Sequence, residues 1–200
     1  MGRKSIVKNR KPITKRVNKW LADLLIVLQD KDVEQLTIDD IATLANKSKS
    51  TIYEYFESKE DILLAACQTR IKTLSDLLHN ERAQKGNPID RYEYLMEVLT
   101  EKLADISTFF LQKIKLHYPS SWNAIDNFTD EFVKSVTALY QEGIKQGVYY
   151  PISIDLMTNL DKYFVTQVVT DPSIFSDNDH SLSDLVQDYL RLRLVGLVKK

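Results

Sequence analysis

The sequence predicts an all-α protein of about nine helices. Apolar residues recur three and four positions apart along most of the chain, which is the spacing of a buried helical face. Gly and Pro are scarce, with five of each in 200 residues, so few positions interrupt a helix. Hydrophobic residues make up 44% of the chain, enough for a substantial buried core. We expect two folded units, at residues 13–58 and 59–200, behind a basic segment at residues 1–12.

The first unit is predicted to hold three helices, of which the second and third form a helix-turn-helix within residues 37–60. Thr37 can cap one helix, with Asp40 three residues later to complete a capping box. Ser48 can cap the next helix, over 49–56, and Ser58 can cap another that begins at Lys59. Between the two, Asn46 suits the left-handed backbone in which many helices end.

The helix predicted over 49–56 has an unusual surface. Ile52 and Phe56 face inward, which leaves a polar outer face of Lys49, Ser50, Thr51, Tyr53 and Tyr55. Hydroxyls, phenols and one ammonium suit a helix in the DNA major groove, where they can bond to base edges and phosphates. Taken alone, the helix fits equally well a short amphipathic helix with ordinary polar decoration.

The whole stretch resembles the tetracycline-repressor (TetR) family of transcriptional regulators. The resemblance lies in Ile41-Ala42, in Asn46 at the turn, and in the runs from Ser48 to Phe56 and from Ser58 to Leu63. The pattern Tyr-x-Tyr-Phe-x-Ser-Lys-Glu is long and specific, and the likeness is sharp over about residues 13 to 65.

The chain departs from the family pattern at four places. The family usually has Gly where this chain has Asn46, an apolar residue where it has Lys47, and Ala where it has Leu24. A Gly usually ends the first helix, where this chain has Asp30-Lys31-Asp32. None of these departures removes a side chain that would face DNA.

The resemblance implies that the first unit binds double-stranded DNA. We expect Lys49, Ser50 and Thr51 to approach base edges, and Tyr53, Tyr55 and Lys59 to anchor phosphates. Thr37, at a helix N-terminus, should add a phosphate contact. The complete predicted DNA-binding set is Thr37, Lys47, Ser48, Lys49, Ser50, Thr51, Tyr53, Tyr55 and Lys59.

Charge is distributed unevenly along the chain, although the net charge is only −1. Residues 1–22 contain no acid and eight bases, which are Arg3, Lys4, Lys8, Arg10, Lys11, Lys15, Arg16 and Lys19. A basic arm at one end of a near-neutral protein is typical of a phosphate-binding feature. It is also typical of a solvated tail, and the two interpretations are compatible because such arms often order only on DNA.

The second unit, residues 59–200, is predicted to bind a ligand and to dimerise. A helix over 59–79 would link it to the first unit, and 81–88 reads as a break. Further helices are expected at 90–104, 108–116, 121–146, 154–170 and 182–199.

The middle helices are rich in aromatic residues, and burial in the core is the simpler interpretation for any one of them. The resemblance implies a pocket for an unknown small apolar or aromatic ligand, with candidate lining residues Tyr92, Phe109, Phe110, Trp122, Phe128 and Phe132.

The last two helices carry more apolar residues than one buried face needs. We expect two copies to pair these helices into a four-helix bundle about a two-fold axis, which makes the protein a homodimer. The candidate interface residues are Leu156, Leu160, Phe164, Leu185, Tyr189 and Leu197.

The sequence offers no catalytic, cofactor or metal motif. It has no Gly-rich phosphate loop and no nucleophile elbow. No H-x-x-x-H or C-x-x-C pair exists, and Asp177-Asn178-Asp179 lacks the Gly and Glu of a calcium loop. The single cysteine, Cys67, reads as a small buried hydrophobe in a reducing compartment. We expect a cytoplasmic protein, because no apolar run approaches about 20 residues and no apolar segment follows the basic N-terminus.

These patterns predict a DNA-binding transcriptional regulator rather than an enzyme. In the favoured interpretation, a homodimeric repressor is released from a palindromic operator by a small-molecule ligand. The alternative is a TetR-like DNA-binding or protein-interaction scaffold that has no small-molecule switch.

Overall fold

The computed structural model describes residues 10–171 and 182–199, and this part of the chain is helical and contains no strand. It has ten α-helices and one 3-10 helix, η1. Their bounds are α1 (Lys15–Val27), α2 (Ile38–Leu44), α3 (Lys49–Tyr55), α4 (Lys59–Leu78), α5 (Glu81–Gln84), α6 (Pro88–Leu103), α7 (Thr108–His117), α8 (Pro119–Lys145), α9 (Ile154–Thr166), η1 (Val168–Thr170) and α10 (Leu182–Leu197). The predicted all-α class is confirmed.

The helix bounds differ from the prediction in two ways. The break expected at 81–88 contains the short α5, because the Asn80 side chain caps it by accepting the Ala83 backbone N–H at 2.9 Å. Two helices begin at prolines, Pro88 and Pro119, a little earlier than expected. Proline is well suited to a first helical turn, where its missing N–H would have had no helical partner. The count is therefore ten α-helices rather than about nine.

Helices α1 to α3 share one small core. The rings of Trp20 and Phe56 meet edge to face with centroids 5.9 Å apart. Leu21, Ile41 and Ile52 are fully buried around them, one from each helix. Aromatic and aliphatic side chains of this size supply most of the driving force for packing. The core therefore fixes α3 with its polar side outward.

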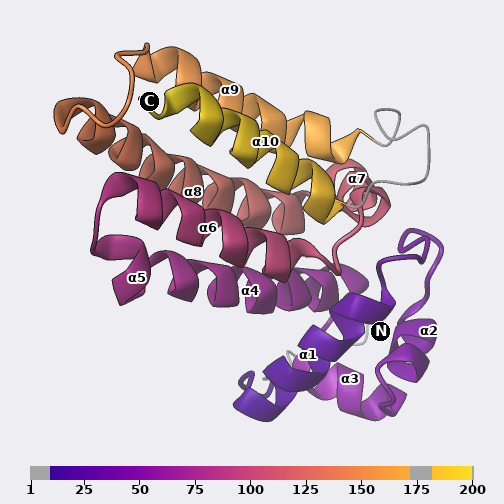
Figure 1. Cartoon of the computed structure of the whole chain (residues 1–200). Coiled ribbons are helices and arrows are strands. Elements are labelled where there is room, and N and C mark those ends of the chain that lie inside the picture. The colour runs from indigo at the N-terminus through magenta and orange to yellow at the C-terminus, as the bar shows by residue number, and fades with distance from the viewer. Residues whose placement is uncertain (1–9, 172–181, 200) are drawn as a thin grey trace, which may run out of the picture.

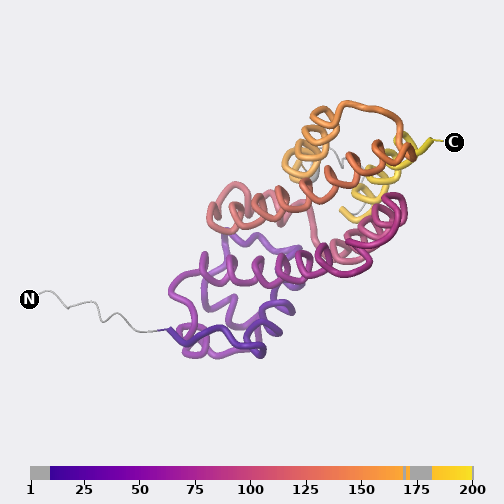
Figure 2. The backbone as a smooth tube through the Cα atoms, turned by 90° about the vertical axis from the view of Figure 1, so that its left-hand side faces the viewer, coloured from indigo at the N-terminus to yellow at the C-terminus, as the bar shows by residue number. Residues whose placement is uncertain are grey.

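Helix α4 connects these three helices to the rest of the chain. It packs against α1 on one side and against α8 on the other, while α6 packs on α10 and α8 on α9. Figure 1 shows α1 to α3 at one end of the molecule and α9 and α10 as an outer layer at the other. The tube in Figure 2 shows the same two-part arrangement from the side, with the C-terminus far from α3. Because α4 shares its packing with both parts, a domain boundary at residue 59 stays a prediction.

Candidate functional site

The turn between α2 and α3 has the geometry that Asn46 was expected to provide. Thr37 and Asp40 form a complete capping box at the start of α2. At its end, Asn46 has a φ of 51°, the only positive φ among the described non-glycine residues. The Lys47 N–H donates to Ala42 O at 2.9 Å and the Asn46 N–H to Thr43 O at 3.0 Å. These two bonds are the Schellman motif, which Asn can support in place of Gly.

The start of α3 presents a compact group of hydroxyls. Ser48 Oγ accepts the Thr51 backbone N–H at 3.1 Å and lies 2.9 Å from Ser50 Oγ and 2.8 Å from Thr51 Oγ1. Ser48, Ser50 and Lys49 are exposed, and Thr51 is half-buried. Small hydroxyls that bond to one another at the surface can exchange these partners for base edges or phosphates. This part of the predicted set is brought together at one helix end.

Lys49 does not project freely into solvent. Its ammonium lies 2.8 Å from a carboxylate oxygen of Asp39, the second residue of α2. The hydrogen bond to that carboxylate raises the pKa of Lys49 above its ordinary value. Lys49 therefore has to leave Asp39, or share it, in order to reach a base or a phosphate.

The position of Lys59 does not fit the phosphate contact that was predicted for it. Its ammonium donates to three backbone carbonyls of the loop between α1 and α2, those of Val33, Glu34 and Leu36, at 2.9, 2.7 and 2.9 Å. It also lies 5.6 Å from the centre of the Tyr118 ring. With all three N–H donors used, Lys59 holds that loop against the first turn of α4.

Tyr53 and Tyr55 lie on α3 with half-buried side chains. Tyr55 packs against the core, with its ring centroid 6.2 Å from that of Phe56. The Tyr53 carbonyl accepts a hydrogen bond from the Arg10 guanidinium. Neither phenol forms a hydrogen bond with another residue in the described part of the chain, so both hydroxyls are open to an external partner.

The described part of the basic arm folds back along α3. Arg10 pairs with Glu57 at 3.2 Å and Lys11 with Glu54 at 2.9 Å. The Lys11 backbone N–H also donates to Glu54 O at 2.9 Å. The other predicted arm bases, Arg3, Lys4 and Lys8, lie outside the described residues. The chain is thus anchored to α3 only four residues before α1 begins.

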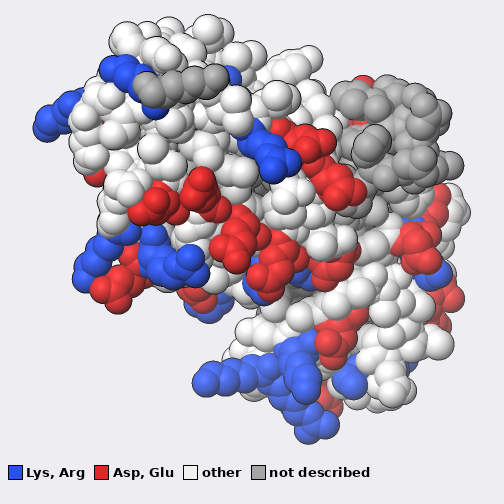
Figure 3. Space-filling view, in the orientation of Figure 1, with Lys and Arg blue, Asp and Glu red and all other residues white. Residues whose placement is uncertain are grey.

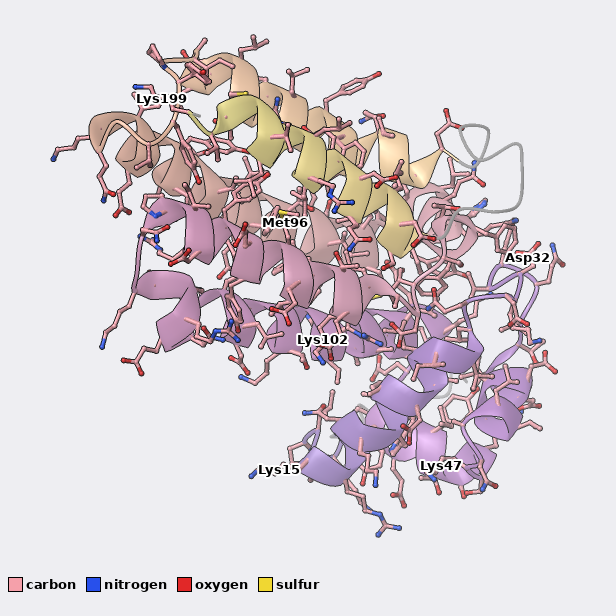
Figure 4. The ribbon with its side chains drawn as sticks, viewed as in Figure 1. Lys15, Asp32, Lys47, Met96, Lys102 and Lys199 are labelled. Carbon is pink, nitrogen blue, oxygen red and sulfur yellow. The ribbon has the colours of Figure 1, made fainter. Side chains whose placement is uncertain are left out.

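Three basic residues of α1, which the sequence showed as charged but did not assign to the DNA-binding set, lie at the same end of the molecule as α3. Lys15, Arg16 and Lys19 are exposed, and no described residue forms an ion pair with them. The first turn of α1 contains no acid, although a helix N-terminus favours acids over bases. Figure 3 shows basic side chains gathered at this end of the molecule, and Figure 4 places Lys15 and Lys47 along the same lower edge. Because the helix dipole disfavours cations in this first turn, the basic residues there indicate that an external anion binds at this end of α1.

An apolar cavity lies inside the helical bundle. Its volume is about 140 Å³, close to the ~150 Å³ that accommodates benzene in another protein's core. Helices α4, α6, α7, α8, α9 and α10 all contribute to its wall, which is almost wholly apolar. Four of the six predicted lining residues, Phe110, Trp122, Phe128 and Phe132, do line it.

Two predicted pocket residues do not line this cavity. Tyr92 is buried elsewhere, with its ring 6.1 Å from that of Tyr140 and its hydroxyl bonded to Leu190 O at 3.4 Å. Phe109 points outward from α7 and is 38% exposed. Both residues were candidates because they are aromatic residues of the middle helices, and aromatic content does not tell which side of a helix faces the cavity.

The lining of the cavity is spread along α8. It runs from Trp122 to Val136, which is roughly 21 Å of helix at about 1.5 Å per residue.

Two ion pairs border the cavity. Arg70, on α4, donates to Asp105 at 2.5 Å and to Lys102 O at 2.8 Å. At the other end, buried Asp161 accepts from the Tyr140 hydroxyl at 2.7 Å, the Tyr189 hydroxyl at 2.7 Å and Arg193 Nε at 3.0 Å. Burial raises the pKa of both phenols, so they remain protonated donors and keep this network intact.

Cys67 also lies in the cavity wall. It is buried, and this burial raises the pKa of its thiol to about 12. A thiol that stays protonated is a poor nucleophile and a poor metal ligand. No group of three or more potential metal ligands occurs among the described residues.

The outer layer of α9 and α10 exposes an apolar surface different from the predicted one. Leu156 and Leu160 are exposed as expected, but Phe164 and Leu197 are buried inside the protomer and Leu185 is half-buried. Tyr189 stacks on Phe164 at 3.7 Å and bonds to Asp161. The exposed apolar side chains are instead Leu156, Leu160 and Tyr163 on α9 and Leu192 and Val195 on α10. These five residues form what we call the α9–α10 surface.

The arrangement defines a class of protein, a helix-turn-helix DNA-binding regulator with an internal cavity. Residues 24–66 match the sequence model of "Bacterial regulatory proteins, tetR family". The uncharacterised HTH-type transcriptional regulator YvaF of Bacillus subtilis (strain 168) is 24% identical over 152 residues, which is 74% of this chain and 78% of YvaF. The segment 24–66 thus matches the TetR family of transcriptional regulators, and the chain as a whole is similar to an HTH-type regulator.

Solved structures share the fold over nearly the whole chain. A transcriptional regulator from Saccharomonospora viridis in complex with choline has a TM-score of 0.71 at 17% identity and covers 94% of this chain and 100% of its own. FadR of Bacillus subtilis in complex with stearoyl-CoA has a TM-score of 0.65 at 18% identity, with 89% and 98% covered. In the described part of this chain, no helix is long and apolar enough to span a membrane.

Proposed function

We propose that this regulator is a homodimeric repressor that leaves a palindromic DNA site when a small apolar molecule enters the cavity. The observation that supports this most is the position of α4. Its first residue, Lys59, holds the loop beside the DNA-binding helices, while Cys67, Arg70, Ile71 and Leu74 further along line the cavity. One rigid helix therefore touches both sites, and a ligand that favours one orientation of α4 shifts the population of DNA-binding states.

The proposed DNA contacts divide into base readers and phosphate anchors. Lys49, Ser50 and Thr51 at the start of α3 are the proposed base readers, because a helix enters the major groove by its N-terminal residues in this motif. Thr37, Lys47, Ser48, Tyr53 and Tyr55 are the proposed phosphate anchors, joined by Lys15, Arg16 and Lys19 of α1. Lys59 is left out because its donors are used inside the protein.

The cavity favours an elongated apolar ligand. Its wall is apolar along roughly 21 Å of α8, so an alkyl chain could contact it throughout. A compact cation such as choline would lose its hydration there and meet a carboxylate, Asp161, that Arg193 already neutralises. Of the two ligands bound by similar structures, the acyl chain of stearoyl-CoA has the better matched shape.

The proposal is tested first on DNA. The full-length protein selects fragments from a random double-stranded pool, and the enriched site is expected to be a palindrome with half-sites about 34–36 Å apart. Thr51→Ala should relax preference at one base position, and Tyr53→Phe should weaken all sites alike. Selection of no duplex DNA, or of sites without two-fold symmetry, contradicts the proposed repressor.

The ligand switch is tested with straight-chain alcohols of increasing length. Binding can be followed by the emission of Trp122, which lines the cavity, in a Trp20→Phe variant that removes the only other tryptophan. We expect bound chains to weaken the selected DNA site, and branched or cyclic alcohols of equal carbon number to bind less well. Chains that bind at Trp122 without changing DNA affinity would favour the constitutive scaffold instead.

A further inference from the structure

Arg70 extends from the wall of the apolar cavity to a partly exposed turn. It lies on α4 between Cys67 and Leu74, which also line the cavity. Because the wall is almost wholly apolar, it is the aliphatic stem of Arg70 that meets the empty space. The guanidinium is directed to the turn at 104–107, which joins α6 to α7. Long cationic side chains often combine a buried stem with a polar head in this way.

The guanidinium of Arg70 has two partners near this turn. It donates to Asp105 Oδ2 at 2.5 Å and to Lys102 O, near the end of α6, at 2.8 Å. Asp105 lies between Leu103 and Ile106, which both line the cavity. Figure 4 labels Lys102 at the junction of α6 and α4. The ion pair therefore stands at the border between the apolar space and the surface.

Asp105 is only partly satisfied as a hydrogen-bond acceptor. Its other oxygen, Oδ1, is buried and accepts no hydrogen bond from the described residues. A buried carboxylate oxygen without a donor is costly, because it has lost its water and gained no partner in exchange. The Asp105 side chain is still 31% exposed, so a rotation about its own bonds brings it into water. Asp105 can therefore release Arg70 at little cost to itself.

The ion pair at the other end of the cavity is different. Asp161 has donors on both oxygens, Tyr140 on one and Tyr189 with Arg193 on the other. Its side chain is buried, with only 4% of the residue exposed. A carboxylate held by three donors and closed from water cannot leave without stranding buried partners. Of the two pairs, the one between Arg70 and Asp105 is suited to open.

We propose that Arg70 is the head-group site for a ligand that carries one carboxylate on an aliphatic chain. The inference rests on the proposed ligand site in the cavity and adds the chemical class of the ligand. The chain lies along the apolar wall, and the ligand carboxylate takes the place of Asp105 on the guanidinium. One carboxylate replaces another, so Arg70 keeps a counter-ion while Asp105 gains water. Arginine suits this role because its planar fork of N–H donors matches a carboxylate.

The volume of the cavity limits the length of the chain. About 140 Å³ is close to the ~150 Å³ that holds benzene, so a chain of roughly six to eight carbons fits with little adjustment. A carboxylate of this kind is ionised at neutral pH, as the side chain of Glu is. An alcohol of equal length offers the same chain without the charge, and an amine would bring a second cation to Arg70. Octanoate, octan-1-ol and octylamine are therefore the matched probes.

Calorimetry on the full-length protein, without DNA, measures the affinity for each probe. We expect octanoate to bind at least about tenfold more tightly than octan-1-ol, and octylamine to bind more weakly than either, because the carboxylate gains a charge-assisted bond. Arg70→Met keeps the aliphatic stem and should bring the ratio of octanoate to octan-1-ol affinity down to about one. The matched control is Lys162→Met, which breaks a pair with Asp130 at 2.6 Å outside the cavity wall and should keep the wild-type ratio.

Asp105→Asn distinguishes a head-group site from an ion pair that only stabilises the fold. It removes the charge that competes for Arg70, so the ratio of octanoate to octan-1-ol affinity should rise at least about fivefold. Loss of a merely structural pair would affect both probes alike and leave the ratio unchanged. The control is Asp130→Asn, which removes an equal charge from the pair with Lys162. This variant also carries the test if Arg70→Met does not fold.

The outcomes separate the head-group site from the proposed function. Equal binding of octanoate and octan-1-ol to the wild type, or a ratio in Asp105→Asn no higher than in Asp130→Asn, overturns the head-group site alone. The cavity as a ligand site then stands, because octan-1-ol still binds, and selection of DNA is a separate measurement. Binding of none of the three probes overturns the head-group site together with the proposed ligand switch.

Discussion

Asp39 places a negative charge against Lys49, the one lysine of α3 and a proposed base reader. Its carboxylate lies 2.8 Å from the Lys49 ammonium, and both side chains are more than half exposed. An exposed pair of this kind adds little to stability. In the proposed complex its effect would be on binding, since DNA would compete with Asp39 for Lys49 and would approach the carboxylate itself.

We therefore predict that Asp39→Asn strengthens DNA binding several-fold at low salt. If the freed Lys49 neutralises a phosphate beside its proposed base contact, the slope of log affinity against log salt should also steepen by up to about 0.9. The control is Asp76→Asn on α4, which releases Lys72 from a 3.9 Å pair on another part of the surface. Fluorescence anisotropy over a salt series measures both quantities. Equal effects of the two variants would show that the Asp39 charge is not at the interface.

Lys59 illustrates the opposite case, a cation that the family pattern suggested for DNA and that the fold uses internally. Lys59→Met should lower the free energy of unfolding by about 1–3 kcal/mol, because three loop carbonyls lose their donor. The DNA affinity of the folded protein should change less than twofold, because Lys59 makes no contact with DNA in the proposed complex. Thermal melts and anisotropy are compared with Lys72→Met on the same helix, which should leave the melting temperature nearly unchanged. A Lys59→Met protein that is as stable as the wild type but binds DNA more weakly would support the phosphate contact first predicted for Lys59.

At the scale of elements, the basic first turn of α1 is expected to lower the stability of the helix and to strengthen DNA binding. Lys15 and Arg16 occupy its first turn, where the helix dipole disfavours cations. We predict that the double variant Lys15→Gln, Arg16→Gln melts at a higher temperature and binds DNA more weakly, with a salt slope shallower by up to about 1.8 for two lost contacts.

The matched control for α1 is the pair Lys134→Gln, Lys145→Gln on α8, both exposed. Lys145 lies in the last turn of α8, where the dipole favours a cation. This control should therefore melt slightly lower and bind DNA as the wild type does. If both double variants shift the salt slope equally, the effect is one of net charge and not of position.

The elements also show which features of the fold can be predicted from the sequence and which cannot. Caps at Thr37, Ser48 and Ser58 and the turn at Asn46 were predictable because each depends on residues within a few positions. The role of Lys59 was not, because its partners lie 23 to 26 residues away and are backbone atoms. The residues that line the cavity were predicted only in part. Phe110 and Tyr92 were both candidates as aromatic residues of the middle helices, but only the packing of the surrounding helices decides which of them meets the cavity.

At the scale of the whole molecule, the α9–α10 surface is the proposed interface of a dimer in which two copies of α3 would act together. Leu192 and Val195 are 72% and 74% exposed, three residues apart on α10, beside Leu156, Leu160 and Tyr163 on α9. Exposed apolar side chains grouped on two neighbouring helices are typical of an interaction surface. Two-fold pairing of the α9–α10 surface would give the four-helix bundle that the sequence predicted, with Leu156 and Leu160 kept and the other predicted residues replaced by Tyr163, Leu192 and Val195.

The corrected residues change the decisive experiment. Tyr189→Asp would place a charge beside Asp161 inside the protomer, so it would unfold the monomer and say nothing of the dimer. Leu192→Asp changes a side chain that solvent already reaches in the single protomer. We predict that Leu192→Asp keeps the helical content and melting behaviour of a folded chain but becomes monomeric, because the interface would bury the new charge twice.

Loss of the dimer should reach α3 at the far end of the molecule. A monomer binds one half-site, so affinity for the selected palindrome should fall by a factor of about 10² or more, while affinity for an isolated half-site stays the same. The control is Leu116→Asp on α7, an equally exposed leucine at 65% that lies outside the α9–α10 surface. Light scattering beside titrations of the palindrome and of the half-site measures each variant. A Leu192→Asp protein that scatters as a dimer and holds the palindrome as tightly as the Leu116→Asp control would move the interface away from α9 and α10.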